Sequence, residues 1–305
     1  MSDVVAVGSS SADPTREISA QLGGAENVNL PVEQRLWHLR RVETMLLESS
    51  PGSALLDNFL EEVLRFMDYG QQDPSFQLFV VSFIEKACRQ DCEMLRKAFI
   101  VIKNTYIARE TAVSVRKKII NLTSQVYPLI FSWVAGLKND SRAEGVWHCM
   151  EEMKKMIMPS TDSDNQGICT MAIKFLQTVI LCQTVRTQHS EASRHRGMTM
   201  SLDKLSRDHR YISYRKLNDE AFLDFNNLTE RMRSPHIPSL NLLTCIGCVC
   251  EIARQRPDYI KMVLSALEYV QFNLPPTLTA SQVKSVRKEM KMHLLRLLSP
   301  MAPGR

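Results

Sequence analysis

The chain has 305 residues, of which 44% are hydrophobic and 23% charged, a composition that supports a sizeable core and is ordinary for a globular protein. Only 11 residues are glycine, which argues against an all-β chain rich in tight turns and against glycine-rich phosphate loops. The net charge of +5, from 38 Lys and Arg against 33 Asp and Glu, is too small to imply nucleic-acid binding by itself.

The N-terminal sequence MSDVVAVGSSSADPT lacks the basic start and the long apolar run of a signal peptide. The longest apolar stretch, YPLIFSWVAGL (127–137), is too short to cross a bilayer. We therefore expect an intracellular protein without membrane insertion. Its eight cysteines are then expected to be reduced thiols rather than a disulfide framework.

Residues 1–30 are rich in Ser, Gly, Ala and Asn and show no sustained periodicity, which predicts a disordered N-terminal tail. From Pro31 onward, apolar residues recur at helical spacing, and clusters of Pro, Gly, Asp and Ser separate the segments. The run LFVVSFI (78–84) has a high β propensity, but it continues into EKAC without a turn signal, so we predict a buried helix. We expect about eleven helices, no strand and a short tail at 301–305.

Two segments, FVVSFIEKA (79–87) and VRKKIINLT (115–123), resemble each other weakly and begin 36 residues apart, each after an acidic turn. The segment MAIKFLQTV (171–179) has the same layout after the turn DSDNQG. Helix pairs that recur in this way predict an all-α fold, an arc-shaped α-solenoid of HEAT-like antiparallel helix pairs over residues 31–300 with a concave binding face. A non-repetitive helical bundle is the alternative.

The positive charge is concentrated in one segment. Between Arg186 and Leu217 there are eight Lys and Arg residues against three acidic ones, whereas the rest of the chain sums to zero. The hydrophobic pattern resumes on both sides of this segment, which predicts a long basic loop at about 187–210 within one domain rather than a linker between two. We expect Tyr211 and Tyr214 to anchor its second half to the helices, and His209 to be solvated.

The motif CIGCVC (245–250) raises the possibility of a metal site or a redox pair. On a helix, Cys245 and Cys248 are about 60° apart and Cys250 points away from both, so three thiolates cannot converge on one ion. Cys245 also belongs to an unbroken apolar stripe from Leu242 to Ala253. We predict one continuous helix whose cysteines fill space and bind no metal. A thiol enzyme or metalloprotein remains a competing reading.

No other residues assemble a site for chemistry: we expect no catalytic residue, no cofactor, no metal ligand set and no enzyme activity. Asp162 and Asp164 precede a helix and are expected to cap its N–H groups. The last helix, at 281–298, is expected to pack through an apolar stripe. It carries Lys284, Arg287, Lys288 and Lys291 on its outer face. This face is either simply solvated or part of a nucleic-acid groove.

Six blocks resemble the N-terminal domain of the symplekin family, the scaffold proteins of mRNA 3′-end processing. They are LLDNFLEEVLRF (55–66), VSFIEKACRQD (81–91), DSDNQGICTMAIKF (162–175), SLDKLSRDHRYISY (201–214), IARQRPDYI (252–260) and NLPPTLTASQVKSVRKEMKMHLLRLL (273–298). The blocks follow the order of the family, and the resemblance runs from about residue 32 to the end of the chain.

The resemblance implies a non-enzymatic scaffold with an arc of HEAT-type helix pairs and a long loop. Its concave side is expected to dock and stimulate a phosphatase, which acts on the fifth-position serine of the RNA polymerase II C-terminal-domain heptads. Cleavage and polyadenylation factors are the wider partners. The implied location is nuclear, and a cytoplasmic location in addition is compatible with the resemblance. The competing function is a basic helical-repeat module that binds RNA directly through the loop and the last helix.

Within the block ending in AIKF, Lys174 matches the lysine that family members direct at the phosphatase. The resemblance therefore implies that Lys174 lies on the concave face and binds this partner. We expect the core contacts of this helix to come from the apolar neighbours Ala172, Ile173, Leu176 and Ile180. Lys174 then lies on a different face of the helix. A solvated lysine without a partner is the alternative.

Overall fold

The computed structural model describes residues 13–48, 54–71, 73–190 and 200–298, and these ranges form twelve α-helices without a strand. The helices are α1 (Pro14–Glu26), α2 (Val32–Leu47), α3 (Leu55–Leu64), α4 (Pro74–Gln90), α5 (Met94–Ile107), α6 (Val113–Gly136), α7 (Ser141–Ile157), α8 (Gln166–Cys182), α9 (Tyr214–Met232), α10 (Ser239–Gln255), α11 (Ile260–Phe272) and α12 (Ala280–Leu298). Four short 3-10 helices accompany them: η1 (Arg65–Gln71), η2 (Met158–Asp162), η3 (Leu202–Lys204) and η4 (Pro257–Tyr259).

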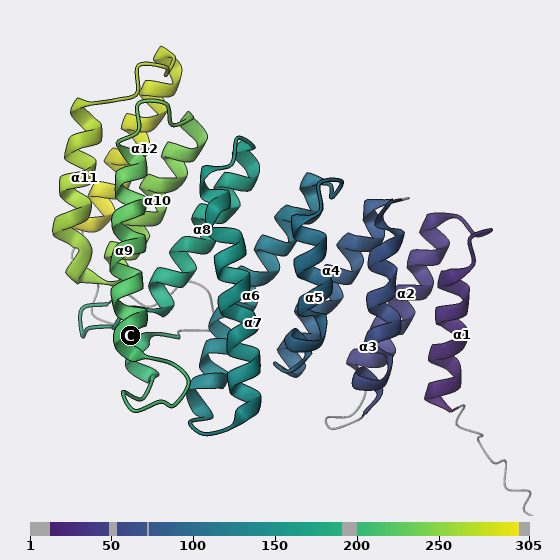
Figure 1. Cartoon of the computed structure of the whole chain (residues 1–305). Coiled ribbons are helices and arrows are strands. Elements are labelled where there is room, and N and C mark those ends of the chain that lie inside the picture. The colour runs from purple at the N-terminus through teal and green to yellow at the C-terminus, as the bar shows by residue number, and fades with distance from the viewer. Residues whose placement is uncertain (1–12, 49–53, 72, 191–199, 299–305) are drawn as a thin grey trace, which may run out of the picture.

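The helices form two layers, with the odd-numbered helices in one and the even-numbered helices in the other (Figure 1). Each even-numbered helix packs against the next, from α2 through α4, α6, α8 and α10 to α12. This stacking of successive helix pairs confirms the predicted all-α solenoid. The buried helix predicted at 78–84 is also confirmed, since it lies within α4.

The weak sequence repeat has a structural counterpart. Its three segments, 79–87, 115–123 and 171–179, lie on α4, α6 and α8, which are consecutive helices of the even layer. Each of these helices packs against the next one in the same layer. The repeat therefore reflects one packing environment used three times.

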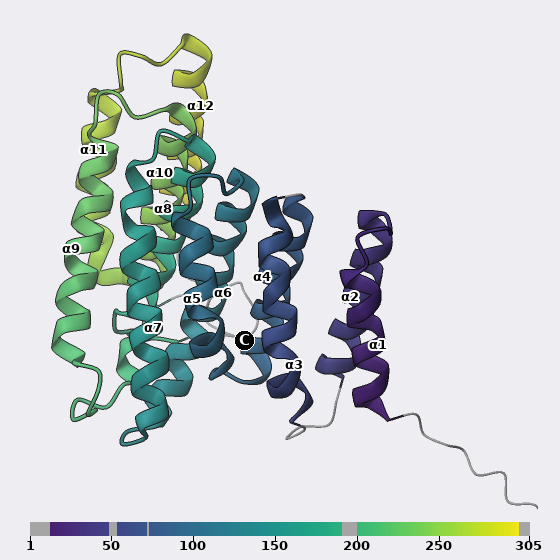
Figure 2. The ribbon, with the colours of Figure 1, turned by 45° about the vertical axis from the view of Figure 1, so that its right-hand side comes forward.

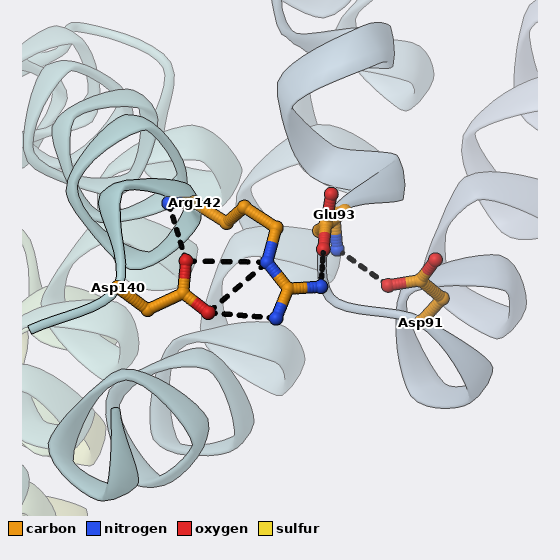
Figure 3. A network of polar contacts seen from close by, with 4 residues as sticks. All are labelled: Asp91, Glu93, Asp140 and Arg142. Carbon is orange, nitrogen blue, oxygen red and sulfur yellow. Dashed lines mark hydrogen bonds and ion pairs between the residues drawn. The ribbon is translucent and has the colours of Figure 1, made fainter.

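Acidic residues at the turns fix where helices begin. The Asp73 and Asp140 carboxylates accept hydrogen bonds from the first turns of α4 and α7. Arg142 then joins two successive turns: its guanidinium donates to Asp140 at 2.6 and 3.0 Å, and to Glu93 at the start of α5 at 3.0 Å (Figure 3). This network ties neighbouring pairs together at one edge of the solenoid, and it lies on the exposed surface.

The hydrophobic core has two parts that share α8. Ile168, Ala172, Phe175 and Val179 of this helix belong to the part formed with α1–α7. Cys169, Ile173, Leu176 and Ile180 belong to the part formed with α9–α12. Two faces of α8 are therefore buried, and only the remaining face is open to solvent.

The prediction of a disordered tail over residues 1–30 is wrong for residues 14–26, which form α1 alongside α2 (Figures 1 and 2). Asp13 caps the helix by accepting from the Thr15 N–H, and Pro14 occupies its first turn. Ile18, Leu22 and Ala25 share one face and are buried. Residues 1–12 lie outside the described residues.

The predicted basic loop lies between α8 and α9, with residues 191–199 outside the described residues. Its second half is ordered against the helices, as predicted: Leu202, Leu205 and Ile212 are buried in the core. Tyr211 and Tyr214 also pack against this core.

The prediction that His209 is solvated is wrong. Its side chain is only 7% exposed, and its Nε2 atom lies 3.1 Å from the Val134 carbonyl at the end of α6. Its Nδ1 atom accepts from the N–H groups of Tyr211 and Ile212, at 3.3 and 3.2 Å. Nε2 is therefore the donor. The ring fastens the loop to α6 because it satisfies buried backbone groups from two distant segments.

Candidate functional site

The candidate site is the solvent-facing surface of the even-numbered helices, hereafter the inner surface. Neighbouring even-numbered helices contact each other more extensively than neighbouring odd-numbered helices do. In a curved double layer, the more closely spaced layer lies on the inside of the arc. We therefore infer that this layer forms the concave side, which is the binding side in solenoid proteins.

Lys174 lies in the middle of the one open face of α8. Its side chain is exposed, whereas Ala172, Ile173, Leu176 and Ile180 are buried. The predicted separation of Lys174 from the packing stripe is therefore confirmed. Because two faces of α8 are committed to the core, the direction of the Lys174 side chain is set by packing on both sides of it.

Two threonines flank Lys174 along α8, one turn away on each side. Thr178, one turn further along α8, donates to the Lys174 carbonyl and lies 3.1 Å from the Ser124 hydroxyl of α6. On the other side, Thr170 donates to Asn241 of α10 at 3.0 Å. These bonds join α6, α8 and α10 without placing an acid beside the lysine, so the described residues provide no ion-pair partner for the Lys174 ammonium group.

Two other lysines of the even layer, on α4 and α6, are neutralised within the chain. Lys86 of α4 pairs with Glu43 at 2.9 Å, and Lys118 of α6 pairs with Glu85 at 3.7 Å. Lys117 of α6 instead lies against the start of α8, near enough that a Cβ atom on Gly167 would be 3.3 Å from its ammonium nitrogen. Lys117 and Lys174 are thus positive charges available to an acidic group of a partner.

The cysteine prediction is confirmed in its geometry. Cys245, Cys248 and Cys250 lie on the single helix α10, and all three are buried. Burial raises the pKa of the Cys248 and Cys250 thiols to about 12, which keeps them protonated and therefore poor nucleophiles and ligands. Gly247 on the same helix lies beside His293 of α12, where a Cβ atom would be 3.8 Å from the ring. Small residues here allow α10 and α12 to approach closely.

Among the described residues there is no group of three or more His, Cys, Asp or Glu side chains positioned to hold a metal ion. In the same part of the chain, every helix falls short of the length and apolar character needed to span a membrane.

The expectation that Asp162 and Asp164 cap α8 is wrong. Asn165 is the capping residue: its side-chain oxygen accepts from the N–H groups of Gly167 and Ile168, both at 3.1 Å. Asp162 instead pairs with Arg231 of α9 at 2.7 Å. The side-chain oxygen of Asn caps a helix as well as that of Asp does. Residue type alone therefore could not show which of Asp162, Asp164 and Asn165 is the cap.

Asp162 and Arg231 line a polar pocket of about 680 Å³ between the turn before α8, helix α9 and the start of α10. Asp224 of α9 also lines this pocket. Burial raises the pKa of Asp224 to about 6, with a smaller rise from Glu220, while the positive charge of Lys154 opposes both. Lys154 itself is buried and pairs with Glu220 at 2.6 Å.

Replacing Asp224 with Asn is expected to stabilise the protein at pH 7.5 by about 1–2 kcal/mol, after allowance for partial solvent screening. Because the folded-state pKa is raised, the protonated carboxyl favours folding below about pH 4, and this contribution is lost as the pH rises through about 6. Urea unfolding at pH 7.5 and 5 measures the effect, which should shrink by about half at pH 5.

The matched control is Asp219→Asn, which removes an exposed carboxylate of the same helix that pairs with Arg215. It should change stability little at either pH. An equal gain for Asp224→Asn at both pH values would show that this carboxyl does not titrate in the range.

The chain matches the Symplekin/PTA1 N-terminal family over residues 112–303, a range that includes Lys174, the basic loop and α12. The chain belongs to the Symplekin/PTA1 N-terminal family. The family assignment confirms the resemblance drawn from the sequence. Four of the six resembling blocks lie within the matched residues, while LLDNFLEEVLRF and VSFIEKACRQD precede them.

One similar protein is the mRNA cleavage and polyadenylation specificity factor complex subunit pta1 of Schizosaccharomyces pombe. It is 25% identical over an alignment of 195 residues, and the alignment covers 60% of this chain. The chain spans only 28% of the length of that relative.

Two solved structures are similar over 92% of this chain. One is a designed armadillo repeat protein in complex with a (KR)4 peptide, covered to 99%, with a TM-score of 0.45 and 11% identity. The other is an engineered protein covered to 97%, with a TM-score of 0.41 and 13% identity. The solenoid assignment itself rests on the arrangement of the helices in the two layers.

Proposed function

We propose that this chain is a non-enzymatic scaffold of pre-mRNA 3′-end cleavage and polyadenylation, acting in the nucleus. It docks on its inner surface, and stimulates, a phosphatase that removes phosphate from the fifth-position serine of the RNA polymerase II heptads. Family membership over residues 112–303 supports the scaffold role, since the relative pta1 is a subunit of a cleavage and polyadenylation complex.

The observation that carries the phosphatase proposal is the position of Lys174. It is the lysine of the AIKF block, within the matched residues, and it is exposed at the centre of the open face of α8. A positive charge held in place by packing, with neutral hydroxyl groups around it, suits a carboxylate on a partner surface. Two observations favour a binding function over a catalytic one. The Cys248 and Cys250 thiols are buried with raised pKa values, and the chain belongs to a family that includes a complex subunit.

Replacing Lys174 with Ala is expected to weaken phosphatase binding by roughly 1–3 kcal/mol if the partner's acidic group becomes desolvated on docking. Stimulation of phosphopeptide turnover should fall in parallel. Folding should not change, because the side chain is exposed. The measurements are phosphatase affinity by calorimetry, turnover of a phosphoserine heptad peptide, and thermal stability of the scaffold.

Lys261→Ala provides the control, because Lys261 is also exposed but lies on α11 in the odd-numbered layer. It should leave binding and stimulation at the wild-type level. Wild-type affinity in a stably folded Lys174→Ala variant would remove Lys174 from the interface. Absence of any binding by the wild-type chain would overturn the phosphatase proposal as a whole.

A further inference from the structure

The last helix, α12, packs through one face and leaves the opposite face open. Val286 and Met290 are buried against α10, and Gln282 donates to Ser239 at the start of α10 at 3.0 Å. Since α12 is the final helix of the even layer in the described chain, no further helix of that layer covers its other face.

The open face of α12 carries a row of positive charges. Lys284, Arg287, Lys288 and Lys291 are all exposed, and we call them the basic face. At 3.6 residues per turn they fall within an arc of about 100° and a length of about 10 Å. This arc lies opposite Val286 and Met290.

The basic face gathers, on one side of a single helix, four cations without acidic partners among the described residues. On other helices, several exposed lysines are neutralised across helices: Lys97 of α5 pairs with Asp57, and Lys103 with Glu152 at 3.7 Å. For the four cations of the basic face, the described residues offer no ion pair, and the one acid of α12, Glu289, pairs with His293 at 3.5 Å. Like charges three and four residues apart destabilise a helix, so an anionic ligand would relieve this repulsion.

We propose that the basic face of α12 binds the phosphate backbone of RNA without reading its sequence. Four cations within about 10 Å match a polymer that carries a phosphate on every residue better than a peptide with isolated phosphates. The basic face has no aromatic side chain for base stacking, so the contact is electrostatic and independent of sequence.

The basic loop is a weaker candidate for the same role. Arg207 and Arg210 in its described second half lie 5.6 and 5.5 Å from the rings of Tyr214 and Tyr211, so their guanidinium groups are already engaged. The cations of α12 have no such contacts among the described residues. This assignment stands on charge and packing, and it does not depend on the phosphatase.

The test is fluorescence anisotropy of the full chain with a labelled mixed-sequence RNA about 20 nucleotides long, over a range of salt concentrations. With about four phosphate contacts, the slope of log affinity against log salt should be about −3. The triple variant Lys284→Ala, Lys288→Ala, Lys291→Ala should lose roughly tenfold or more in affinity at low salt. Its slope should approach about −0.7, the value for one remaining phosphate contact.

A control of equal charge change is the triple variant Lys97→Ala, Lys103→Ala, Lys155→Ala, whose lysines lie on the odd-numbered helices α5 and α7. It should keep the wild-type affinity and slope. Equal losses in both triple variants would reduce the effect to overall charge and overturn the proposal.

Two further arms identify the ligand. A phosphoserine peptide at equal phosphate concentration, or vesicles containing phosphatidylserine, should compete poorly with the RNA. Effective competition by either one would assign the face to that partner instead. A measurement on the wild-type chain needs no variant: RNA should protect Lys284, Lys288 and Lys291 from acetylation, and their unchanged reactivity would contradict the proposal.

Discussion

Replacing Arg256 with Met is expected to lower the free energy of unfolding by about 3–5 kcal/mol, because it removes two buried hydrogen bonds from a charged donor that contribute roughly 1.5–3 kcal/mol each. Arg256 follows α10 and is only 3% exposed. Urea unfolding followed by circular dichroism measures the loss.

The reason is that Arg256 caps the end of a different helix. Its Nε donates to the Thr184 hydroxyl at 2.8 Å and to the Thr184 carbonyl at 3.3 Å, and its Nη2 donates to the Leu181 carbonyl. These acceptors lie at the C-terminus of α8, where the helix leaves carbonyl groups without partners and where positive charge is favourable. Burial lowers the pKa of Arg256 to about 10, so the guanidinium stays charged at neutral pH.

Met restores some of the apolar volume of Arg256 but removes the charged donor from the Thr184 hydroxyl and from the Leu181 carbonyl. The Thr184 carbonyl keeps the hydrogen bond that the Leu202 N–H donates to it at 3.1 Å. Arg256→Lys should lose less, because an ammonium group keeps the charge but cannot reach both acceptors with the fork geometry of arginine. Arg215→Ala is the control, since Arg215 forms an exposed pair with Asp219 and should change stability by less than about 1 kcal/mol. Wild-type stability of Arg256→Met would show that water or another group caps α8.

Replacing Ile18 with Ala is expected to destabilise the N-terminal end of the solenoid by about 2–4 kcal/mol, as for other fully buried Ile side chains. Ile18 is 0% exposed, within the region that sequence composition marked as a disordered tail. The buried Arg35 of α2 supports the same docking: its Nε donates to the Ala25 carbonyl of α1 at 2.7 Å.

Hydrogen exchange of the α1 amides together with urea unfolding measures this effect. Both are needed because the end of a solenoid can unfold locally while the rest stays folded. Ser19→Ala is the control, since Ser19 is exposed on the same helix and should change stability by no more than about 0.5 kcal/mol. Rapid exchange of these amides in the wild-type protein would mean that α1 is not docked in solution.

The periodic features of the fold follow from the sequence alone. The apolar stripe from Leu242 to Ala253 was enough to place three cysteines on one buried helix, because helix geometry relates residues three and four apart. The same rule placed Lys174 on a different face from Ile173 and Leu176. The family resemblance added what periodicity cannot supply, namely the expected role of Lys174.

Only the tertiary structure decided the status of α1 and of the buried polar groups. Helix α1 contains Gly23 and Gly24, which weaken its intrinsic helix propensity, so its stability depends on docking against α2. At Gly24 a Cβ atom would lie 2.8 Å from the ring of His38. This close contact therefore requires a glycine, one of the residues whose abundance indicated a disordered tail.

The partners of His209 and Arg256 could not be found from local patterns. His209 bonds a carbonyl 75 residues away, and Arg256 bonds Thr184 at a separation of 72 residues. Local periodicity determines which face of a helix is apolar, because neighbours in the sequence fix it. Which buried carbonyl needs a donor depends on where distant helices end once they are packed, and that is settled only when the whole solenoid has formed.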